Sequence, residues 1–300
     1  MITPQPQTGS LVTGYAMVGV VALFFGIAPS FARLAFDGGS GALTLQVLRF
    51  ALCAGVLWIL VLVVRSPRRV PHGQLVALFG LATLTGLASY GYMTSVRYIP
   101  VPLASLIFFV FPLMVAPLAH LAGHERLTVR RVVALGVGFI GLALMLGADF
   151  SNADPLGIGL AFGAGSCVAV SFLLTRRLAG AMAPMVLSAY VTTIAAVAYA
   201  MLVAADGGLE PPTSTLGWIG LITNAGCYAI GLSFLYASIR RLGSVRVAVV
   251  VNLEPVISVL TAWIVLDQLL EPLQAVGAAI VLSGVALVQT ERKPARTNPA

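Results

Sequence analysis

The sequence predicts an all-α integral membrane protein, with ten transmembrane helices arranged as two inverted five-helix repeats. Three observations lead to this prediction: the composition, a series of long apolar runs, and an internal repeat. The mean hydropathy is +1.00, with 59% hydrophobic and only 9% charged residues among 300. Soluble domains carry about 25% charged residues, so the composition excludes an ordinary soluble protein.

Ten apolar runs account for most of the chain. A helix needs roughly 20 apolar residues to cross the ~30 Å hydrocarbon core of a bilayer. The runs are long and continuous rather than alternating, which favours helices over a β-barrel. No loop between them is long enough to fold by itself. The predicted spans are residues 14–35, 43–64, 74–95, 101–122, 130–148, 156–175, 185–204, 216–238, 245–266 and 273–290.

The second half of the chain repeats the first with a shift of 143 positions. Pro112 corresponds to Pro255, and Ser95-Val96-Arg97 corresponds to Ser238-Ile239-Arg240, without a gap. Because each copy holds five spans, an odd number, the second copy crosses the bilayer in the opposite orientation. Inverted repeats around a midplane cavity are typical of secondary transporters. The predicted units are two repeats, 14–148 and 156–290, and two tails, 1–13 and 291–300.

The charged residues alternate between successive loops. By the positive-inside rule the basic loops face the cytoplasm, which predicts cytoplasmic N- and C-terminal tails in a multi-pass plasma (inner) membrane protein. The first thirteen residues carry no Lys or Arg, so we expect an uncleaved first span rather than a signal peptide. The basic loops contain Arg65, Arg68, Arg69, Arg126, Arg130, Arg131, Arg176, Arg177, Arg240, Arg241, Arg246, Arg292, Lys293 and Arg296. The intervening loops contain Asp37, Asp149, Asp154, Asp206, Glu210, Asp267 and Glu271.

Two glycine patterns are interpreted as helix-packing positions. Gly136-Val137-Gly138-Phe139-Ile140-Gly141 matches the dinucleotide-binding fingerprint, but that fingerprint works only between a strand and a helix, and here it lies inside an apolar run. Gly159 and Gly163 form a GxxxG pattern, which allows close helix contact in membranes. The three cysteines and three histidines have no metal-ligand spacing. We therefore expect no cofactor and no metal.

Glu254 is the polar residue that most needs an explanation. It lies about nine residues into its span, thus ~14 Å deep and close to the midplane, where a charge costs about 2.5–3.5 kcal/mol. It stands in Asn252-Leu253-Glu254-Pro255, and the proline predicts a kink. We predict Glu254 and Asn252 as substrate-binding residues, and Pro255 with its repeat partner Pro112 as hinges. A structural carboxylate, protonated or paired with an arginine, is the alternative.

Arg49 is the second intramembrane charge. Gln46, Arg49 and Cys53 share one helix face, which we expect to point into the bundle. The estimated depths of Arg49 and Glu254 differ by only ~7 Å. Two interpretations stay open: the two residues form a structural ion pair, or they bind opposite ends of a zwitterion, with Arg49 taking a carboxylate and Glu254 an ammonium. Gln46 is predicted to belong to the same site.

Further candidate site residues follow from helical spacing. Asn224 and Tyr228 share a face of the eighth span, and Tyr90 lies on the third. Phe111 is the repeat partner of Glu254. Packing is the competing interpretation of the aromatic residues. Arg33 and Arg97 lie at span ends, where they either extend to water or form a basic vestibule.

Several segments together resemble the EamA-type domains of the drug/metabolite transporter superfamily. They are Leu48-Arg49-Phe50, Phe111-Pro112-Leu113 followed by Glu125-Arg126-Leu127, and Leu253-Glu254-Pro255-Val256 followed by Asp267 through Gly284. Asp267 replaces a glutamate that is frequent in that family. The resemblance implies a ten-helix inverted-repeat carrier with a central cavity and alternating access. It covers nearly the whole chain, as two five-helix copies.

The resulting expectation is a secondary transporter for a small metabolite. Export of amino acids or related compounds is the first candidate function. A cationic or aromatic drug/proton antiporter, or an exchanger of phosphorylated metabolites, remains the alternative, and protons are a candidate coupling ion. The expected partners are a small-molecule substrate and the lipid bilayer, not nucleic acid. No nucleophile–base set, filter loop or soluble output domain is recognisable, so an enzyme, a channel or a sensor is not expected.

Overall fold

The computed structural model describes residues 8–96, 98–125, 127–147, 151, 153–205, 207–266 and 271–289. Within these residues every regular element is helical, and no strand occurs. Among the described residues, nine segments are long and apolar enough to cross a membrane, with α4–α5 and α10–α11 each counted as one, and α12 is a shorter apolar helix. The elements are α1 (Thr8–Asp37), α2 (Ala42–Val63), the 3-10 turn η1 (His72–Gln74), α3 (Leu75–Ser95), α4 (Val101–Phe108), α5 (Phe111–Leu121), α6 (Val129–Leu146), α7 (Pro155–Ala181), α8 (Pro184–Ala205), α9 (Thr215–Leu242), α10 (Ser244–Val251), α11 (Leu253–Leu266) and α12 (Pro272–Gln289).

The helices coincide with the ten predicted spans, with two kinds of difference. Some helices continue beyond their apolar run: α7 was expected to end at residue 175 but includes Arg176 and Arg177 and ends at Ala181. Long basic side chains can extend from a helix end toward water or a partner, so charge does not end the helix. In addition, the fourth and ninth spans are each divided into two helices.

Both breaks precede a proline rather than falling on it. One break lies at Phe109–Val110 and the other at Asn252, so Pro112 and Pro255 occupy the first turn of α5 and α11. The kinks expected at the prolines are therefore shifted toward the preceding residues. A proline is tolerated in the first turn because the N–H that it lacks would have no partner there.

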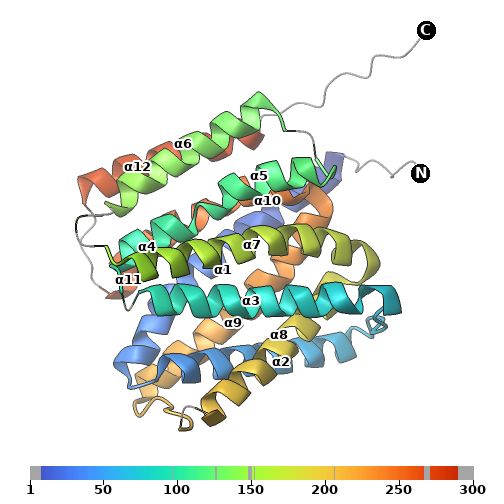
Figure 1. Cartoon of the computed structure of the whole chain (residues 1–300), viewed down its shortest axis with the longest axis vertical. Helices are drawn as coiled ribbons and strands as arrows, with labels where there is room; N and C mark the ends of the chain where they lie inside the picture. Colours follow the sequence, from blue (N-terminus) through green and yellow to red (C-terminus); the bar gives the residue numbers. More distant parts are fainter. Residues whose placement is uncertain are drawn as a thin grey trace.

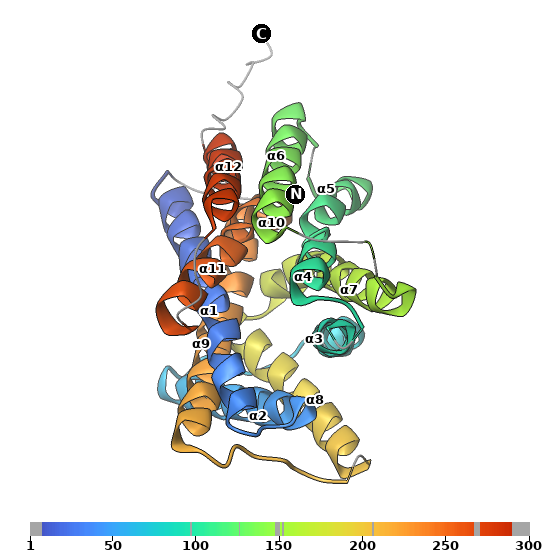
Figure 2. The same ribbon diagram turned by 90° about the vertical axis from the view of Figure 1, so that its left-hand side faces the viewer.

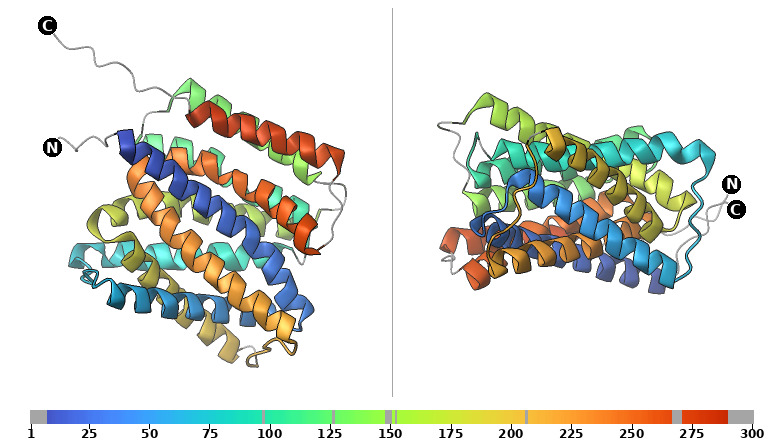
Figure 3. Two further views of the ribbon diagram at one scale, coloured as in Figure 1. Left: turned by 180° about the vertical axis from the view of Figure 1, so that it is seen from behind. Right: turned by 90° about the horizontal axis from the view of Figure 1, so that it is seen from below.

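The helices form a bundle whose two edges each consist of one helix pair. Helix α2 packs along α8 at one edge, and α6 packs along α12 at the other (Figure 1). Viewed end-on, α1, α9 and α11 lie on one side and α3, α4 and α7 on the other (Figure 2). Helix α1 runs beside α9 and contacts α11 (Figure 3). Between the two sides lies α10, whose valines are buried all round the helix, as expected for an apolar central helix.

Glycines bring α6 and α12 into backbone contact. A Cβ on Gly141 would lie 2.7 Å from the Val281 nitrogen, and one on Gly277 would lie 2.5 Å from the Met145 nitrogen. The dinucleotide-like motif thus lies inside a helix and serves packing. The other glycine pattern was interpreted wrongly. A Cβ on Gly159 or Gly163 would meet nothing within 4 Å, because this face of α7 points outward.

The two ends of the bundle differ in charge. We call the end at which α1 begins and α12 ends (Figure 3, left) the basic end, and the opposite end the acidic end. Helix ends and loops of the basic end carry Arg65, Arg68, Arg69, Arg130, Arg131, Arg176, Arg177, Arg240 and Arg241. Those of the acidic end carry Asp37, Asp154, Glu210 and Glu271 together with Arg33. Arg33 is exposed and pairs with Asp37 of its own helix at 2.9 Å. Arg97, Asp149, Asp206 and Asp267 lie outside the described residues.

Candidate functional site

A cavity of about 480 Å³ lies between the two sides of the bundle. Its walls come from α1, α3, α4, α7, α9 and α11, with single residues from other helices. At the acidic end it reaches Val101, the first residue of α4, which is 57% exposed. Toward the basic end it stops at Thr175 and Tyr236, which are 1% and 2% exposed. Among the described residues, the cavity therefore extends to an exposed residue at the acidic end and stops at buried residues at the basic end.

Arg49 enters the cavity wall from the middle of α2. Its side chain is held between two rings: Cζ lies 4.5 Å from the centroid of Tyr228 and 5.0 Å from that of Phe50. Its Nη2 donates to Ser89 Oγ at 2.6 Å, whereas its buried Nε has no hydrogen-bond partner. Aromatic faces attract a guanidinium without using its N–H groups. The guanidinium thus lines the cavity with a buried Nε–H that has no acceptor among the described residues.

Glu254 lines the same cavity from the first turn of α11. The helix itself is held close to α1 by Gly26: a Cβ on Gly26 would lie 2.8 Å from the Glu254 carbonyl oxygen. In the described part of the chain, the Glu254 carboxylate has neither an ion pair nor a hydrogen bond.

Among the described residues that line the cavity, Arg49 is the one basic residue and Glu254 the one acidic residue. No ion pair connects them within the described residues. The cavity therefore presents one guanidinium and one carboxyl group that no contact joins among the described residues. Such a pair has the charges needed for a small molecule with both an anionic and a cationic group.

Three more of the predicted residues line this cavity: Asn224, Tyr228 and Phe111. Asn224 is 1% exposed and its Nδ2 donates to Ala28 O at 2.8 Å, which leaves Oδ1 without a partner. Tyr228 stacks on Phe25 at 5.5 Å between ring centroids. Room for the Phe25 ring comes from Gly231, where a Cβ would lie 2.3 Å from it.

The other three predicted residues lie away from the cavity wall. Gln46 is buried behind it, where its Nε2 donates to Ser89 Oγ and so supports the partner of Arg49. Asn252 is 3% exposed and faces α6, with Nδ2 3.0 Å from a Cβ built on Gly138. Tyr90 is 44% exposed on the outer face of α3. Its aromatic ring is amphipathic, and the outer face of a membrane helix accommodates it.

The α3 residues of the wall, and most of an aromatic group around the predicted Phe111, had not been predicted as site residues; on α3 the prediction was Tyr90. Thr85, Ser89 and Tyr92 follow one another at i, i+4 and i+7, the spacing that places side chains on one helix face, and all three line the cavity. This spacing was available in the sequence. The wall also contains a group of neighbouring rings with centroid separations of 5.0–5.7 Å: Tyr92, Phe108, Phe109, Phe111 and Phe172.

Comparison with known proteins places this architecture in a family. The family model for the EamA-like transporter family matches residues 12–147 and, a second time, residues 155–290. The chain belongs to the EamA-like transporter family. It is thus a multi-pass membrane transporter, and the two matched segments together cover nearly all of its helices.

Individual relatives of this EamA-like chain are distant. An uncharacterized transporter of Archaeoglobus fulgidus is 26% identical over 281 residues, 93% of this chain and 97% of the relative. The threonine/homoserine exporter RhtA of Escherichia coli K12 is 27% identical over 228 residues, 74% of either chain. A crystal structure superposes with a TM-score of 0.77 at 19% identity, covering 92% of this chain and 96% of that one, which supports the fold alone.

Proposed function

We propose that this EamA-like transporter exports amino acids or related zwitterions by alternating access. The observation that carries the proposal is the cavity with one guanidinium, that of Arg49, and one carboxyl group, that of Glu254, which do not contact each other. A substrate with a carboxylate and an ammonium would be compensated by both residues. A substrate with one charge would leave the other protein charge uncompensated in a largely apolar site, which is unfavourable.

Unpartnered polar atoms support the same substrate class. The free Nε of Arg49 is a donor beside the Nη2 that Ser89 already uses, and a guanidinium presents such donors as a fork that matches a carboxylate. The free Oδ1 of Asn224 is an acceptor. We infer that the substrate carboxylate binds Arg49, and that its ammonium binds Glu254 and the Asn224 amide oxygen.

The alternating-access mechanism rests on an inverted repeat. With a shift of 143 positions, α4 (Val101–Phe108) coincides with α10, and α6 (Val129–Leu146) with α12, residue for residue. Under the same shift α1 corresponds to α7 and α3 to α9, so the α1–α9 packing corresponds to the α7–α3 packing. We infer two five-helix copies of opposite orientation, with the breaks before Pro112 and Pro255 as hinges.

The proposed direction is outward. The positive-inside rule assigns the basic end to the cytoplasm, so the cavity faces the outside of the inner membrane in this structure. The relative RhtA is an exporter, which supports the same direction.

The first test is flux of a labelled amino-acid mixture through proteoliposomes, with and without a pH gradient, for the wild type and Glu254→Gln. The expected result is saturable flux in the wild type and its loss in Glu254→Gln, because the ammonium then lacks its anion. Glu271→Gln is the matched control, since this glutamate is exposed at the acidic end. Dependence on the gradient would assign proton exchange to Glu254. Absence of wild-type flux, or an undiminished flux in Glu254→Gln, would refute the proposal.

The aromatic wall favours a second candidate, export of cationic or aromatic drugs. Cations bind the faces of aromatic rings, and Tyr92, Phe108 and Phe111 lie in the cavity wall. Such a substrate needs Glu254 but has no group for Arg49. Export of a lipophilic cation that persists in Arg49→Gln would support this candidate, whereas amino-acid flux requires Arg49. Exchange of phosphorylated metabolites is less compatible, because Arg49 is the single basic residue of the wall within the part of the chain that the structure describes.

A further inference from the structure

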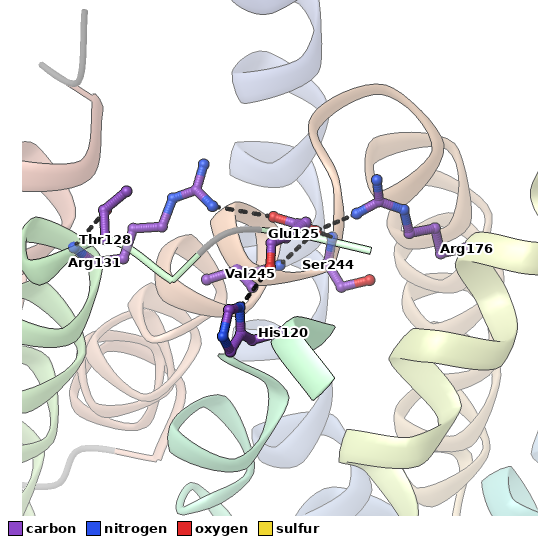
Figure 4. Close-up of polar contacts among 7 residues, drawn as sticks. All are labelled: His120, Glu125, Thr128, Arg131, Arg176, Ser244 and Val245. Carbon is purple, nitrogen blue, oxygen red and sulfur yellow. Dashed lines mark hydrogen bonds and ion pairs between the residues drawn. The ribbon is translucent and has the colours of Figure 1, made fainter. Parts of the chain in front are cut away.

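Glu125 connects three elements at the basic end, below the floor of the cavity. Its carboxylate accepts from Arg131 Nη1 at 3.3 Å and forms an ion pair with Arg176 (Figure 4). It also accepts from the backbone N–H of Ser244 at 2.7 Å, and a weaker contact at 3.4 Å comes from that of Val245. We call this set of contacts the Glu125 joint. Its partners come from α6, α7 and the first turn of α10.

The joint crosses between the two matched halves of the chain. Glu125 and Arg131 belong to the first half, whereas Arg176 and Ser244 belong to the second. The side chain of Glu125 is only 9% exposed, so the joint is largely shielded from water and from screening by salt. A hydrogen bond to a charged group is stronger than one between neutral groups. The carboxylate thus holds the two halves together at this end.

The local backbone is shaped to admit this carboxylate. Gly243 connects α9 to α10 with φ +87°, a conformation that favours glycine. A Cβ at this position would lie 2.5 Å from Glu125 Oε1 and 3.2 Å from Arg176 Nη1. The first turn of α10 presents N–H groups that have no partner within the helix. Two of them, those of Ser244 and Val245, donate to the Glu125 carboxylate. Any other residue at 243 would obstruct the joint.

The joint is directly connected to the cavity. Arg176 follows Thr175, which forms the cavity floor, and Ser244 Oγ donates to Phe172 O, one turn earlier on α7, at 3.2 Å. Helix α10 then runs from Ser244 to the break at Asn252, after which Glu254 enters the cavity. Separation of α7 from α10 at this end would therefore open the floor of the cavity.

We propose that Glu125 is a positioning residue for the transport cycle, whose contacts to Arg176 and the α10 N-terminus keep the basic end closed and must break before the cavity opens there. Arg131 makes this break feasible. It lies in the same half as Glu125, so it remains paired when the second half moves away. A partly buried carboxylate left without any cation would be far more costly.

This inference rests on the proposed alternating access but not on the proposed substrate. Its test is labelling of a single cysteine by a membrane-impermeant maleimide, with no substrate present. Ser171→Cys places the thiol on the α7 wall of the cavity, in a background where Cys53, Cys167 and Cys227 are alanine. Intact cells expose the acidic end in the proposed orientation, and inverted vesicles expose the basic end.

The expected result is labelling from the acidic side only in the parent, and a ~10- to 100-fold faster labelling from the basic side in Glu125→Gln, because neutral hydrogen bonds replace charged ones. Glu125→Asp should recover part of the closure. The matched control is Asp154→Asn, which removes a carboxylate that caps α7 at the opposite end by accepting from Leu156 N at 2.7 Å. It should leave basic-side labelling unchanged.

Folding is separated from closure by a second variant. Arg176→Gln removes the ion pair between the halves but leaves the Arg131 pair and the α10 cap in place, so a folded protein with increased basic-side labelling is expected. Unchanged basic-side labelling in both Glu125→Gln and Arg176→Gln would overturn the proposal. So would an equal increase in Asp154→Asn. If the wild type shows no amino-acid flux while the labelling of the parent and the variants is as expected, only the proposed substrate is refuted.

Discussion

Replacement of Gly277 by alanine should separate α6 from α12. The new Cβ would lie 2.5 Å from the Met145 nitrogen and 2.6 Å from the Gly141 oxygen. Ordinary contact begins near 3.4 Å, so relief of the 2.5 Å contact requires the helices to move apart by about 0.9 Å. Both neighbours are backbone atoms, which no side-chain rotation can relieve. Overpacking of this kind costs about 1–3 kcal/mol, partly offset by the higher helix propensity of alanine, about 1 kcal/mol.

Gly136→Ala is the matched control on the α6 side of the same pair. A Cβ there meets nothing within 4 Å, so only the propensity gain remains. In a thermal unfolding assay on detergent-solubilised protein, we expect Gly277→Ala to unfold at a lower temperature than the wild type, and Gly136→Ala at an equal or higher one. Equal unfolding temperatures for the two variants would refute the backbone contact as the basis of this helix pair.

Three further predictions concern the cavity. Arg49→Lys should raise the KM for amino-acid flux by about 10- to 150-fold, because a point charge replaces the fork and about 1.5–3 kcal/mol is lost; an unchanged KM would exclude carboxylate binding by this residue. Gly231→Ala should displace the Phe25 ring and raise KM, whereas Gly226→Ala, which meets nothing within 4 Å, should not; equal values would show that the ring is unimportant. Pro255→Ala should leave the unfolding temperature nearly unchanged, since no hydrogen bond is missing in a first turn, but should slow flux at saturating substrate; a marked loss of stability instead would assign the proline a purely structural role.

The helices could be predicted from sequence because hydrophobic length and loop charge are local properties. The spans that begin near Ala42, Val101 and Pro272 were predicted to within one residue. The helix breaks were displaced because a proline reports where a new helix starts, not where the previous one ends. Helix α7 continues through Arg176, and this arginine pairs with the carboxylate of Glu125, which is 51 residues away in sequence.

The site was harder to predict because the direction in which a helix face points, toward the cavity or outward, is set only when the bundle assembles. On α3 the face with Tyr92 lines the cavity and the face with Tyr90 is exposed, although the two residues are separated by only one position. Charge was the better guide: Arg49 and Glu254 were selected for their cost in a membrane, and both reach the cavity. Ser89, a neutral partner of Arg49, had no comparable signal.

The closed basic end has a kinetic consequence. In the proposed orientation, an empty exporter that rests with its cavity open to the outside has already completed its delivery, and its next event is the return of the unloaded carrier. We expect this return to limit turnover, as conformational steps do in many proteins. An exporter of this kind is slowed by accumulation of its own product outside, because product that rebinds in the open cavity delays the return. The concentration of substrate in the cytoplasm would control the export rate only when the return of the unloaded carrier no longer limits turnover.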